Sequence, residues 1–182
     1  MRGILIIHIN GNEIGDGKLM IIAAYSGVGK STFASMHPSN VVDFVCMPYK
    51  YFLDTEGKNN NELESCKANP DNAMRPDWPY NYILAIKKIL DRFKIILIPS
   101  DSRVLNLLRA ENIPYILVYP QRDAKYDYLK RFIGRGNTDI FISIFIGYWD
   151  NFLDALENDP CERRITLQPH QFLADVIDIN IF

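Results

Sequence analysis

The sequence predicts a single α/β domain over residues 1–182, with a mostly parallel five-stranded sheet and helices on both faces. Short apolar runs alternate along the chain with segments in which apolar residues recur every three or four positions. Some runs, such as residues 20–25, are apolar throughout, as in strands covered on both faces. A glycine-rich turn directly follows that run. Alternating strands and helices imply right-handed βαβ units, and therefore a parallel sheet between two helical layers.

Apolar runs give the strands in order. The five predicted strands of the sheet are residues 20–25, 41–46, 95–98, 115–119 and 165–167. Residues 3–9 predict an additional short strand. The Asn, Asp and Gly residues between positions 10 and 17 favour turns, so we expect a β-hairpin with the next strand. After the last strand we expect only a short tail.

Helical periodicity gives the remaining elements. The predicted helices are residues 31–36, 82–93, 102–112, 123–133 and 138–157. Pro38 ends the first of them. The aromatic stripe of the last is expected to lie in the core. Between residues 48 and 79 the periodicity disappears, and clustered Asn, Pro and Asp residues indicate loops around a short polar helix at 62–67. We expect this segment to be the most mobile.

Composition excludes several classes of protein. Lys and Arg total 20 and Asp and Glu 22, a net charge of -2 that argues against general nucleic-acid binding. The three cysteines have no CxxC spacing, and the three histidines are scattered, so neither a disulfide framework nor a metal cluster is expected. No apolar run has the length of a membrane span, and the N-terminus is too polar for a signal peptide. We therefore expect a cytoplasmic protein that does not bind membranes.

The strongest motif follows the strand at 20–25. Gly29-Lys30-Ser31 matches the end of the phosphate-binding P-loop pattern, Gly27 adds a flexible position, and Ala24 replaces the leading glycine. Glycines at positive φ turn successive N–H groups toward an anion. In such loops the lysine binds the β- and γ-phosphates, and the Ser31 hydroxyl is a Mg²⁺ ligand. The predicted nucleotide-binding residues are Ser26, Gly27, Val28, Gly29, Lys30, Ser31 and Thr32.

With this motif the sequence resembles the nucleoside and nucleotide kinases among P-loop proteins, the adenylate-kinase-like group. Arg131-Phe132-Ile133-Gly134-Arg135-Gly136-Asn137 follows the fourth strand, where these kinases place a lid whose arginines close over the phosphates. The resemblance implies a short lid at residues 122–137 and an acceptor-side insert at 48–79. More distantly, small uncharacterised kinase-like proteins of bacteria and phages are similar. Comparison with these implies that residues 1–19 are an N-terminal hairpin extension.

The resemblance implies ATP- and Mg²⁺-dependent phosphoryl transfer to a small acceptor, a nucleoside or a nucleoside monophosphate. Lys30, Arg131, Arg135 and Asp43 are the expected catalytic residues. Arg131 and Arg135 are four residues apart, so one helical face presents both guanidiniums to a transferring phosphoryl group. The alternative is a nucleotide-binding regulatory or defence protein with weak or no kinase activity.

Several assignments stay open at the level of sequence. Asp43 fits a carboxylate that faces acceptor or metal, and equally a turn at the end of a strand. With Ser31, Asp101 is a candidate Mg²⁺ ligand, but it also suits the N-cap of the next helix. Arg75 fits an acceptor ligand or a surface side chain. The two arginines on the lid helix also fit a solvated helix face. Tyr25 either shapes a pocket or packs against the lid.

Overall fold

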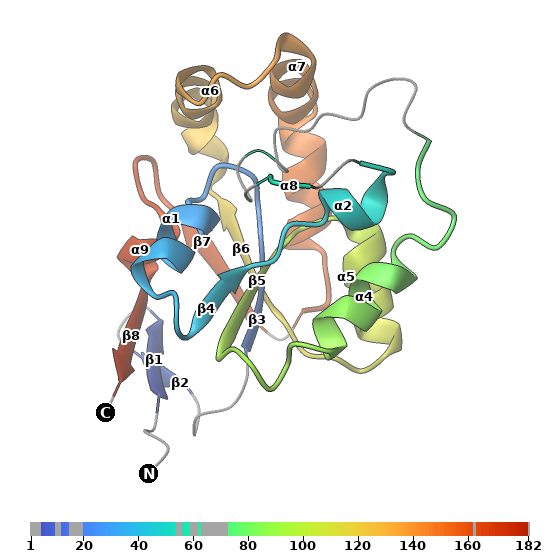
Figure 1. The fold of residues 1–182 in the computed structure, drawn as a ribbon. Coiled ribbons are helices and arrows are strands. Elements are labelled where there is room, and N and C mark those ends of the chain that lie inside the picture. Colours follow the sequence, from blue (N-terminus) through green and yellow to red (C-terminus); the bar gives the residue numbers. More distant parts are fainter. Residues whose placement is uncertain are drawn as a thin grey trace.

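The computed structural model describes residues 5–9, 12–14, 20–53, 56–58, 62, 73–161 and 163–181, with the backbone alone at 5–14 and 180–181. Parallel strands form a central sheet, with helices on both faces and two helices above its carboxyl edge (Figure 1). The predicted α/β class is confirmed.

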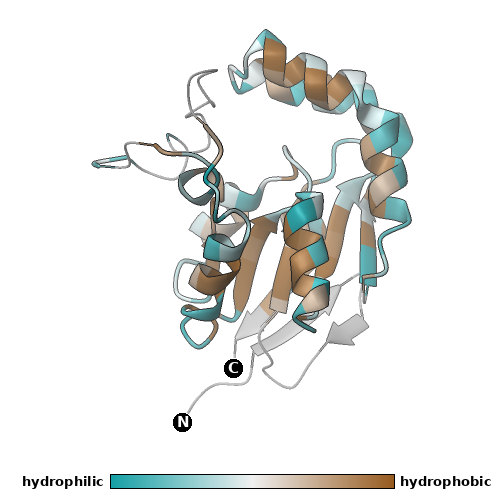
Figure 2. Ribbon diagram, turned by 90° about the vertical axis from the view of Figure 1, so that its right-hand side faces the viewer, coloured by the Kyte–Doolittle hydropathy of each residue, from teal (hydrophilic) through white to brown (hydrophobic). Residues whose placement is uncertain are grey.

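Five strands form the central sheet. They are β3 (Met20–Ala24), β4 (Val41–Asp43), β5 (Ile95–Pro99), β6 (Ile116–Pro120) and β7 (Arg163–Leu167), in the order β4-β5-β3-β6-β7. Every neighbouring pair is parallel, where the sequence predicted a mostly parallel sheet. In Figure 2 the strands are largely hydrophobic, as expected for a sheet covered on both faces.

The direction of each crossover determines which face its helices cover. The connection from β3 to β4 runs in the opposite direction to the connections β4–β5, β5–β6 and β6–β7. Because such crossovers are right-handed, α1 (Lys30–Met36) lies on one face, and α4 (Tyr80–Lys87), α5 (Ser102–Ala110) and α8 (Trp149–Glu157) lie on the other. The short helix α9 (Leu173–Val176) packs beside α1 (Figure 1).

A second sheet, absent from the sequence prediction, lies at the end of the molecule opposite α6 and α7 (Figure 1). Its strands are β1 (Leu5–Ile9), β2 (Asn12–Ile14) and β8 (Ile177–Ile181). β1 and β2 form an N-terminal hairpin, but β1 does not pair with β3, whose two edges are taken by β5 and β6. Instead β1 pairs with β8, in the segment that the sequence prediction treated as a short tail. Apolar and polar residues alternate along β8, where Asp178 and Asn180 separate the isoleucines. An alternation this short did not suffice to predict a strand.

The long helix predicted at 138–157 is two helices, α7 (Asp139–Gly147) and α8. They meet at Tyr148, directly after Gly147, and glycine weakens a helix because its backbone loses the most freedom. The aromatic stripe divides accordingly. Trp149 and Leu153 are buried, whereas Ile140 and Tyr148 are 72% and 60% exposed. Phe141 and Phe145 of α7 are partly buried and pack against the core, so the prediction that the stripe lies in the core is wrong only for its exposed members.

The other predicted helices lie near their expected positions. α6 (Lys125–Gly134) follows a single 3₁₀ turn at Arg122–Ala124. β4 ends at Asp43, before the end of the predicted strand 41–46, and α2 (Met47–Lys50) follows after three irregular residues. Of the helix predicted at 62–67, only Glu62 is among the described residues. Much of the expected insert at 48–79 also lies outside them.

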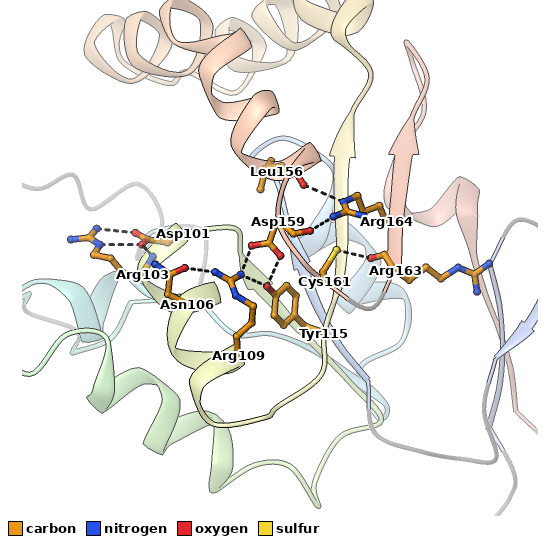
Figure 3. A network of polar contacts seen from close by, with 10 residues as sticks. All are labelled: Asp101, Arg103, Asn106, Arg109, Tyr115, Leu156, Asp159, Cys161, Arg163 and Arg164. Carbon is orange, nitrogen blue, oxygen red and sulfur yellow. Dashed lines mark hydrogen bonds and ion pairs between the residues drawn. The ribbon is translucent and has the colours of Figure 1, made fainter.

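A polar network joins the amino ends of β6 and β7 to the C-terminal ends of α5 and α8 (Figure 3). The buried carboxylate of Asp159 accepts hydrogen bonds from the Tyr115 hydroxyl, at 2.6 Å, and from Arg109. Arg164 donates to the carbonyl oxygens of Leu156 and Asp159. A buried charge is stable only when paired and hydrogen-bonded, and here both conditions hold. The network fixes the α8–β7 turn at the end of the sheet opposite the glycine loop.

Candidate nucleotide site

The glycine loop lies where the topology favours ligand binding. The connections that leave the adjacent strands β3 and β6 run in opposite directions, which makes their carboxyl ends a topological switch point. Open α/β sheets bind ligands at such a switch point. The loop that leaves β3 there is Tyr25-Ser26-Gly27-Val28-Gly29, and α1 begins at Lys30.

Two glycines give the loop its shape. Gly27 and Gly29 have φ values of 84° and 92°, a region that L side chains rarely adopt. Space restricts them as well, since a Cβ atom on Gly27 would lie 2.9 Å from Cε1 of Phe132, and one on Gly29 3.3 Å from Cδ1 of Phe172. The loop backbone is tied down on two sides. Tyr25 N–H donates to Val118 O at 2.9 Å, and Leu173 N–H donates to Val28 O at 2.8 Å.

Lys30 bends back over the loop that precedes it. Its Nζ atom donates to the carbonyl oxygens of Ala24, at 3.4 Å, and Tyr25, at 3.3 Å. These contacts hold the ammonium group at the mouth of the glycine loop, where an anion bound by the loop amides would meet a positive charge. Thr32, two residues further along α1, is exposed.

Ser31 and Asp43 lie together. The Ser31 hydroxyl donates to Oδ2 of Asp43 at 2.7 Å, and Asp43, at the carboxyl end of β4, is only 4% exposed. A hydroxyl and a carboxylate are the hard oxygen ligands that Mg²⁺ takes, with one or two carboxylates completed by phosphate and water. The pair therefore fits the metal that the sequence motif implies. Among the residues that the structure describes, no three His, Cys, Asp or Glu side chains cluster around a metal position.

Asp101 is engaged in a different way. It is the N-cap of α5, where its Oδ1 atom accepts from Arg103 N–H at 3.0 Å. Lys50 and the Arg103 guanidinium each bind its Oδ2 atom at 2.9 Å (Figure 3 shows the Arg103 pair). Burial favours a higher pKa for this carboxyl, but the hydrogen bonds and charges of Arg103 and Lys50 outweigh burial and lower the pKa to about 2. Asp101 therefore caps α5, which was one of its two expected roles. Its role as a Mg²⁺ ligand stays a prediction.

The cations around Asp101 were missed as site residues by sequence reasoning. Lys50 Nζ lies 5.6 Å from the centre of the Trp78 ring, and the Arg103 guanidinium lies 5.9 Å from it. Trp78 is 7% exposed, and its Nε1 donor has no partner among the described groups. Three donors thus surround the carboxyl end of β5. Nothing in the spacing of positions 50, 78 and 103 predicts that they meet, because α2, the turn before α4 and α5 are brought together only by the fold.

The lid arginines have different surroundings. Arg131 is 9% exposed and donates to Gly27 O at 3.1 Å and Gln171 O at 2.9 Å. It also pairs with Asp127 at 2.6 Å, and its guanidinium lies 3.9 Å from the centre of the Phe172 ring. Arg131 therefore links the glycine loop, the lid helix and the segment before α9.

Arg135 is exposed at the C-cap of α6. Arg122, at the start of the same predicted helix, instead pairs with carboxylates of α8, Asp154 at 2.5 Å and Glu157 at 2.6 Å.

Tyr25 packs against the lid. It is 2% exposed, and its ring meets those of Tyr128, Phe145 and Trp149 edge-on at centroid distances of 6.0, 5.6 and 5.7 Å. Its hydroxyl donates to Phe145 O at 3.2 Å, and burial raises its pKa well above the ordinary value for tyrosine. Of the two roles open for Tyr25, the structure assigns packing: the ring anchors the loop to α6, α7 and α8.

No known protein-family model and no curated protein matches the chain. Within the described ranges, no helix combines the length and the apolar composition needed to cross a bilayer.

Proposed function

We propose that the chain is a P-loop kinase of the adenylate-kinase-like group, which transfers the γ-phosphoryl group of ATP to a small acceptor, a nucleoside or nucleoside monophosphate. One observation carries the proposal: the motif Gly29-Lys30-Ser31 stands at a sheet switch point, with Ser31 hydrogen-bonded to the buried Asp43 at 2.7 Å. A glycine turn without this function needs neither an inward lysine nor a carboxylate brought from another strand.

Each residue has a role in this proposal. The loop amides and Lys30 bind the donor phosphates. Ser31 and Asp43 would hold Mg²⁺, which would neutralise charge on the phosphates. An acceptor oxygen forms the new bond to the γ-phosphorus, the bond to the β–γ bridging oxygen breaks, and ADP leaves. Catalysis of this kind is mostly positioning and electrostatics, so few reactive side chains are required.

The cluster of Lys50, Arg103 and Trp78 supports an acceptor side at the ends of β4 and β5. Both cations contact Asp101, but two positive charges against one carboxylate leave the cluster positive. Together with the unpaired Trp78 donor, this favours an acceptor with an anionic group, such as the phosphate of a monophosphate, over a neutral nucleoside. Asp43 adjoins this side through β4 and, for a nucleoside acceptor, also suits orientation of the acceptor hydroxyl.

Nucleotide binding with weak or no transfer is the second candidate. The position of Arg131 favours it, because a guanidinium that is held by Gly27 O, Gln171 O and Asp127 is already engaged. A regulatory or defence protein would need the loop and lid only as a nucleotide-sensing unit.

An ADP-release assay with ATP and Mg²⁺ separates the candidates. We expect release with a panel of nucleoside monophosphates, less with nucleosides, and little without acceptor. The Lys30→Ala variant should lose both turnover and ATP affinity, the latter measured by calorimetry. ATP binding without turnover on any acceptor would support the second candidate, and ATP binding by Lys30→Ala equal to that of the unsubstituted protein would contradict both.

A further inference from the structure

A cavity that is open to solvent lies outside the nucleotide site, between α2 and α4. It has a volume of about 640 Å³, within the range of about 300–1,000 Å³ typical of small-molecule pockets. Phe44, directly after β4, and Tyr49 of α2 form one wall. Asn81 and Leu84, on one face of α4, form part of the other. None of the glycine-loop residues lines it, and neither do Ser31 or Asp43.

The charge of the cavity is positive. Lys88, the C-cap of α4, and Arg92, in the turn after α4, both line it and are both exposed. Neither has a carboxylate partner in the part of the chain that the structure describes. Arg75 also lines it, but is paired with Asp77 at 3.2 Å. No Asp or Glu occurs among the described lining residues. A ligand with a negative group is therefore favoured.

One wall is apolar and held rigidly. The Phe44 ring stacks on Tyr82 at a centroid distance of 5.3 Å and an angle of 16°, and the Tyr82 hydroxyl donates to the Phe44 carbonyl oxygen. Leu84, on the facing helix, is 59% exposed although it is a large apolar side chain. A flat aromatic ring would cover Leu84 and contact the fixed wall.

The cavity lining also contains Asn81, whose side chain has a hydrogen-bond acceptor without a partner in the described structure. The Asn81 amide nitrogen donates to Tyr49 O at 2.7 Å and to Asp77 Oδ1 at 3.1 Å, which fixes the orientation of the amide. Its Oδ1 atom is then buried without a hydrogen-bond partner in the described structure, and such an atom costs free energy until a donor reaches it. An N–H group on the ligand would supply that donor.

We propose that the α2–α4 cavity binds a small planar aromatic anion that carries an N–H donor, at a site separate from the nucleotide loop. Lys88 and Arg92 bind the anionic group, Phe44 and Leu84 contact the ring, and Asn81 accepts from the N–H. Aromatic amino acids of the aminobenzoate type and nucleoside monophosphates both have this chemistry.

The probe for the test is 1-anilinonaphthalene-8-sulfonate, which has an aromatic body, an anilino N–H and a sulfonate. Titration of the full chain, followed by probe fluorescence, should show one saturable site. The variants Leu84→Glu and Lys88→Gln/Arg92→Gln should each weaken binding at least tenfold. Ile140→Glu is the matched control, because Ile140 is also exposed but lies on α7, and it should leave binding unchanged. Loss of binding in Ile140→Glu, or unchanged binding in the cavity variants, would overturn the proposal.

A second set of titrations separates this site from the proposed kinase site. Binding of the probe should persist in Lys30→Ala and in saturating ATP with Mg²⁺, and it requires no turnover, so it can succeed even if the kinase proposal fails. Displacement of the probe by ATP in the unsubstituted chain that is lost in Lys30→Ala would place the cavity in the nucleotide site and contradict a separate one. Displacement by 2-aminobenzoate or by adenosine monophosphate supports the proposal and shows which kind of anion fits. Displacement by neither overturns the ligand class.

Discussion

The guanidinium of Arg131 donates a hydrogen bond to the carbonyl oxygen of Gly27 at 3.1 Å, so a lid residue holds the glycine loop directly. The same side chain lies against the rings of Tyr128 and Phe172, at 4.5 and 3.9 Å from their centres. The shape of the loop therefore depends on α6 and on the segment before α9 as well as on its own glycines. Arg131 acts in this geometry as a positioning residue, while contact with a phosphoryl group stays a prediction.

Substitution of Arg131 should weaken both folding and ATP binding. Arg131→Ala removes two charged hydrogen bonds and the guanidinium partner of Asp127, which is 13% exposed and keeps a hydrogen bond from His170 N–H at 3.1 Å. We expect a loss of about 2–4 kcal/mol in the free energy of unfolding, measured in urea. ATP affinity by calorimetry should also fall. Arg131→Lys should recover little of either, because an ammonium cannot donate in two directions while stacking.

Arg135→Ala is the matched control, since Arg135 is exposed at the end of the same helix. It should leave stability and ATP affinity within the error of the measurement. If the two substitutions have equal effects on stability, Arg131 does not hold the loop.

Gly27, which has positive φ and lies against the lid helix, should tolerate a methyl group poorly. Gly27→Ala adds the strain of a left-handed backbone, about 1–2 kcal/mol, and a contact of 2.9 Å with Phe132, whose ring is fully buried and cannot move away. We expect a total destabilisation of about 2–5 kcal/mol by thermal or urea unfolding. Gly136→Ala is the control, because Gly136 has φ 69° but a Cβ there would meet no atom within 4 Å. A similar cost in both variants would show that packing around Gly27 is loose.

The features predicted from sequence are those with local causes. Continuous apolar runs such as Ile21-Ile22-Ala23-Ala24 and Ile95-Ile96-Leu97-Ile98 specify buried strands, and these are 3% exposed or less. The glycine loop is specified by residue type, since Gly27 and Gly29 do adopt positive φ. The order of the strands and the second sheet were not predicted, because the pairing of β1 with β8 joins opposite ends of the chain and leaves no local pattern.

In the candidate site, too, the residues with a local sequence pattern could be predicted, and the contacts made by the fold could not. The motif residues Lys30 and Ser31 were identified from spacing alone. Whether Asp43 or Asp101 adjoins Ser31 depends on the order β4-β5-β3 and on which cations reach each carboxylate, and Lys50 is 51 positions away from Asp101. The equal treatment of Arg131 and Arg135 followed from their spacing of four. The structure separates them because α6 ends at Gly134, which leaves Arg135 beyond the packed part of the helix.

The charge of Asp101, the N-cap of α5, should make the free energy of unfolding depend on pH. The pKa of Asp101 is lowered to about 2 in the folded chain, so its charge stabilises the fold above the ordinary pKa of about 4, and that contribution disappears as the pH falls from about 4 to about 2. Asp101→Asn keeps a good N-cap and removes the charge. We expect it to destabilise by about 2 kcal/mol at pH 7, with a difference that shrinks toward zero near pH 2.

Urea unfolding of the unsubstituted protein and of Asp101→Asn at several pH values measures this difference in the free energy of unfolding. The exposed residue Asp91 provides the control, and Asp91→Asn should not change the pH dependence. A difference between Asp101→Asn and the unsubstituted protein that stays constant from pH 7 to pH 2 would show that the charge of Asp101 does not contribute.

Arg135 is the remaining candidate for the lid's action on the phosphates, and its effect should appear in turnover. The residue is exposed at the C-cap of α6, immediately before the turn that leads to α7 above the carboxyl edge of the sheet (Figure 1). In the proposed kinase it reaches the donor only when the lid closes. Contacts made mainly in the transition state lower kcat and leave the KM for ATP almost unchanged. We therefore expect Arg135→Ala to lose about a hundredfold in kcat, as does removal of one preorganised donor to developing charge.

Two further variants distinguish this role from that of a solvated helix face. Arg135→Lys should recover only part of kcat, because a point charge does not reproduce the bidentate geometry of a guanidinium. Lys130→Ala removes an exposed cation from the same helix, where Lys130 lies 4.5 Å from the centre of the Tyr126 ring, and should leave kcat unchanged. Equal, small losses for Arg135→Ala and Lys130→Ala would mean that general positive charge on α6 matters and a specific phosphate contact does not. Because Arg131 is already bound to Gly27 O, no neighbouring arginine on α6 could then replace Arg135, and transfer would have to proceed without an arginine from this helix.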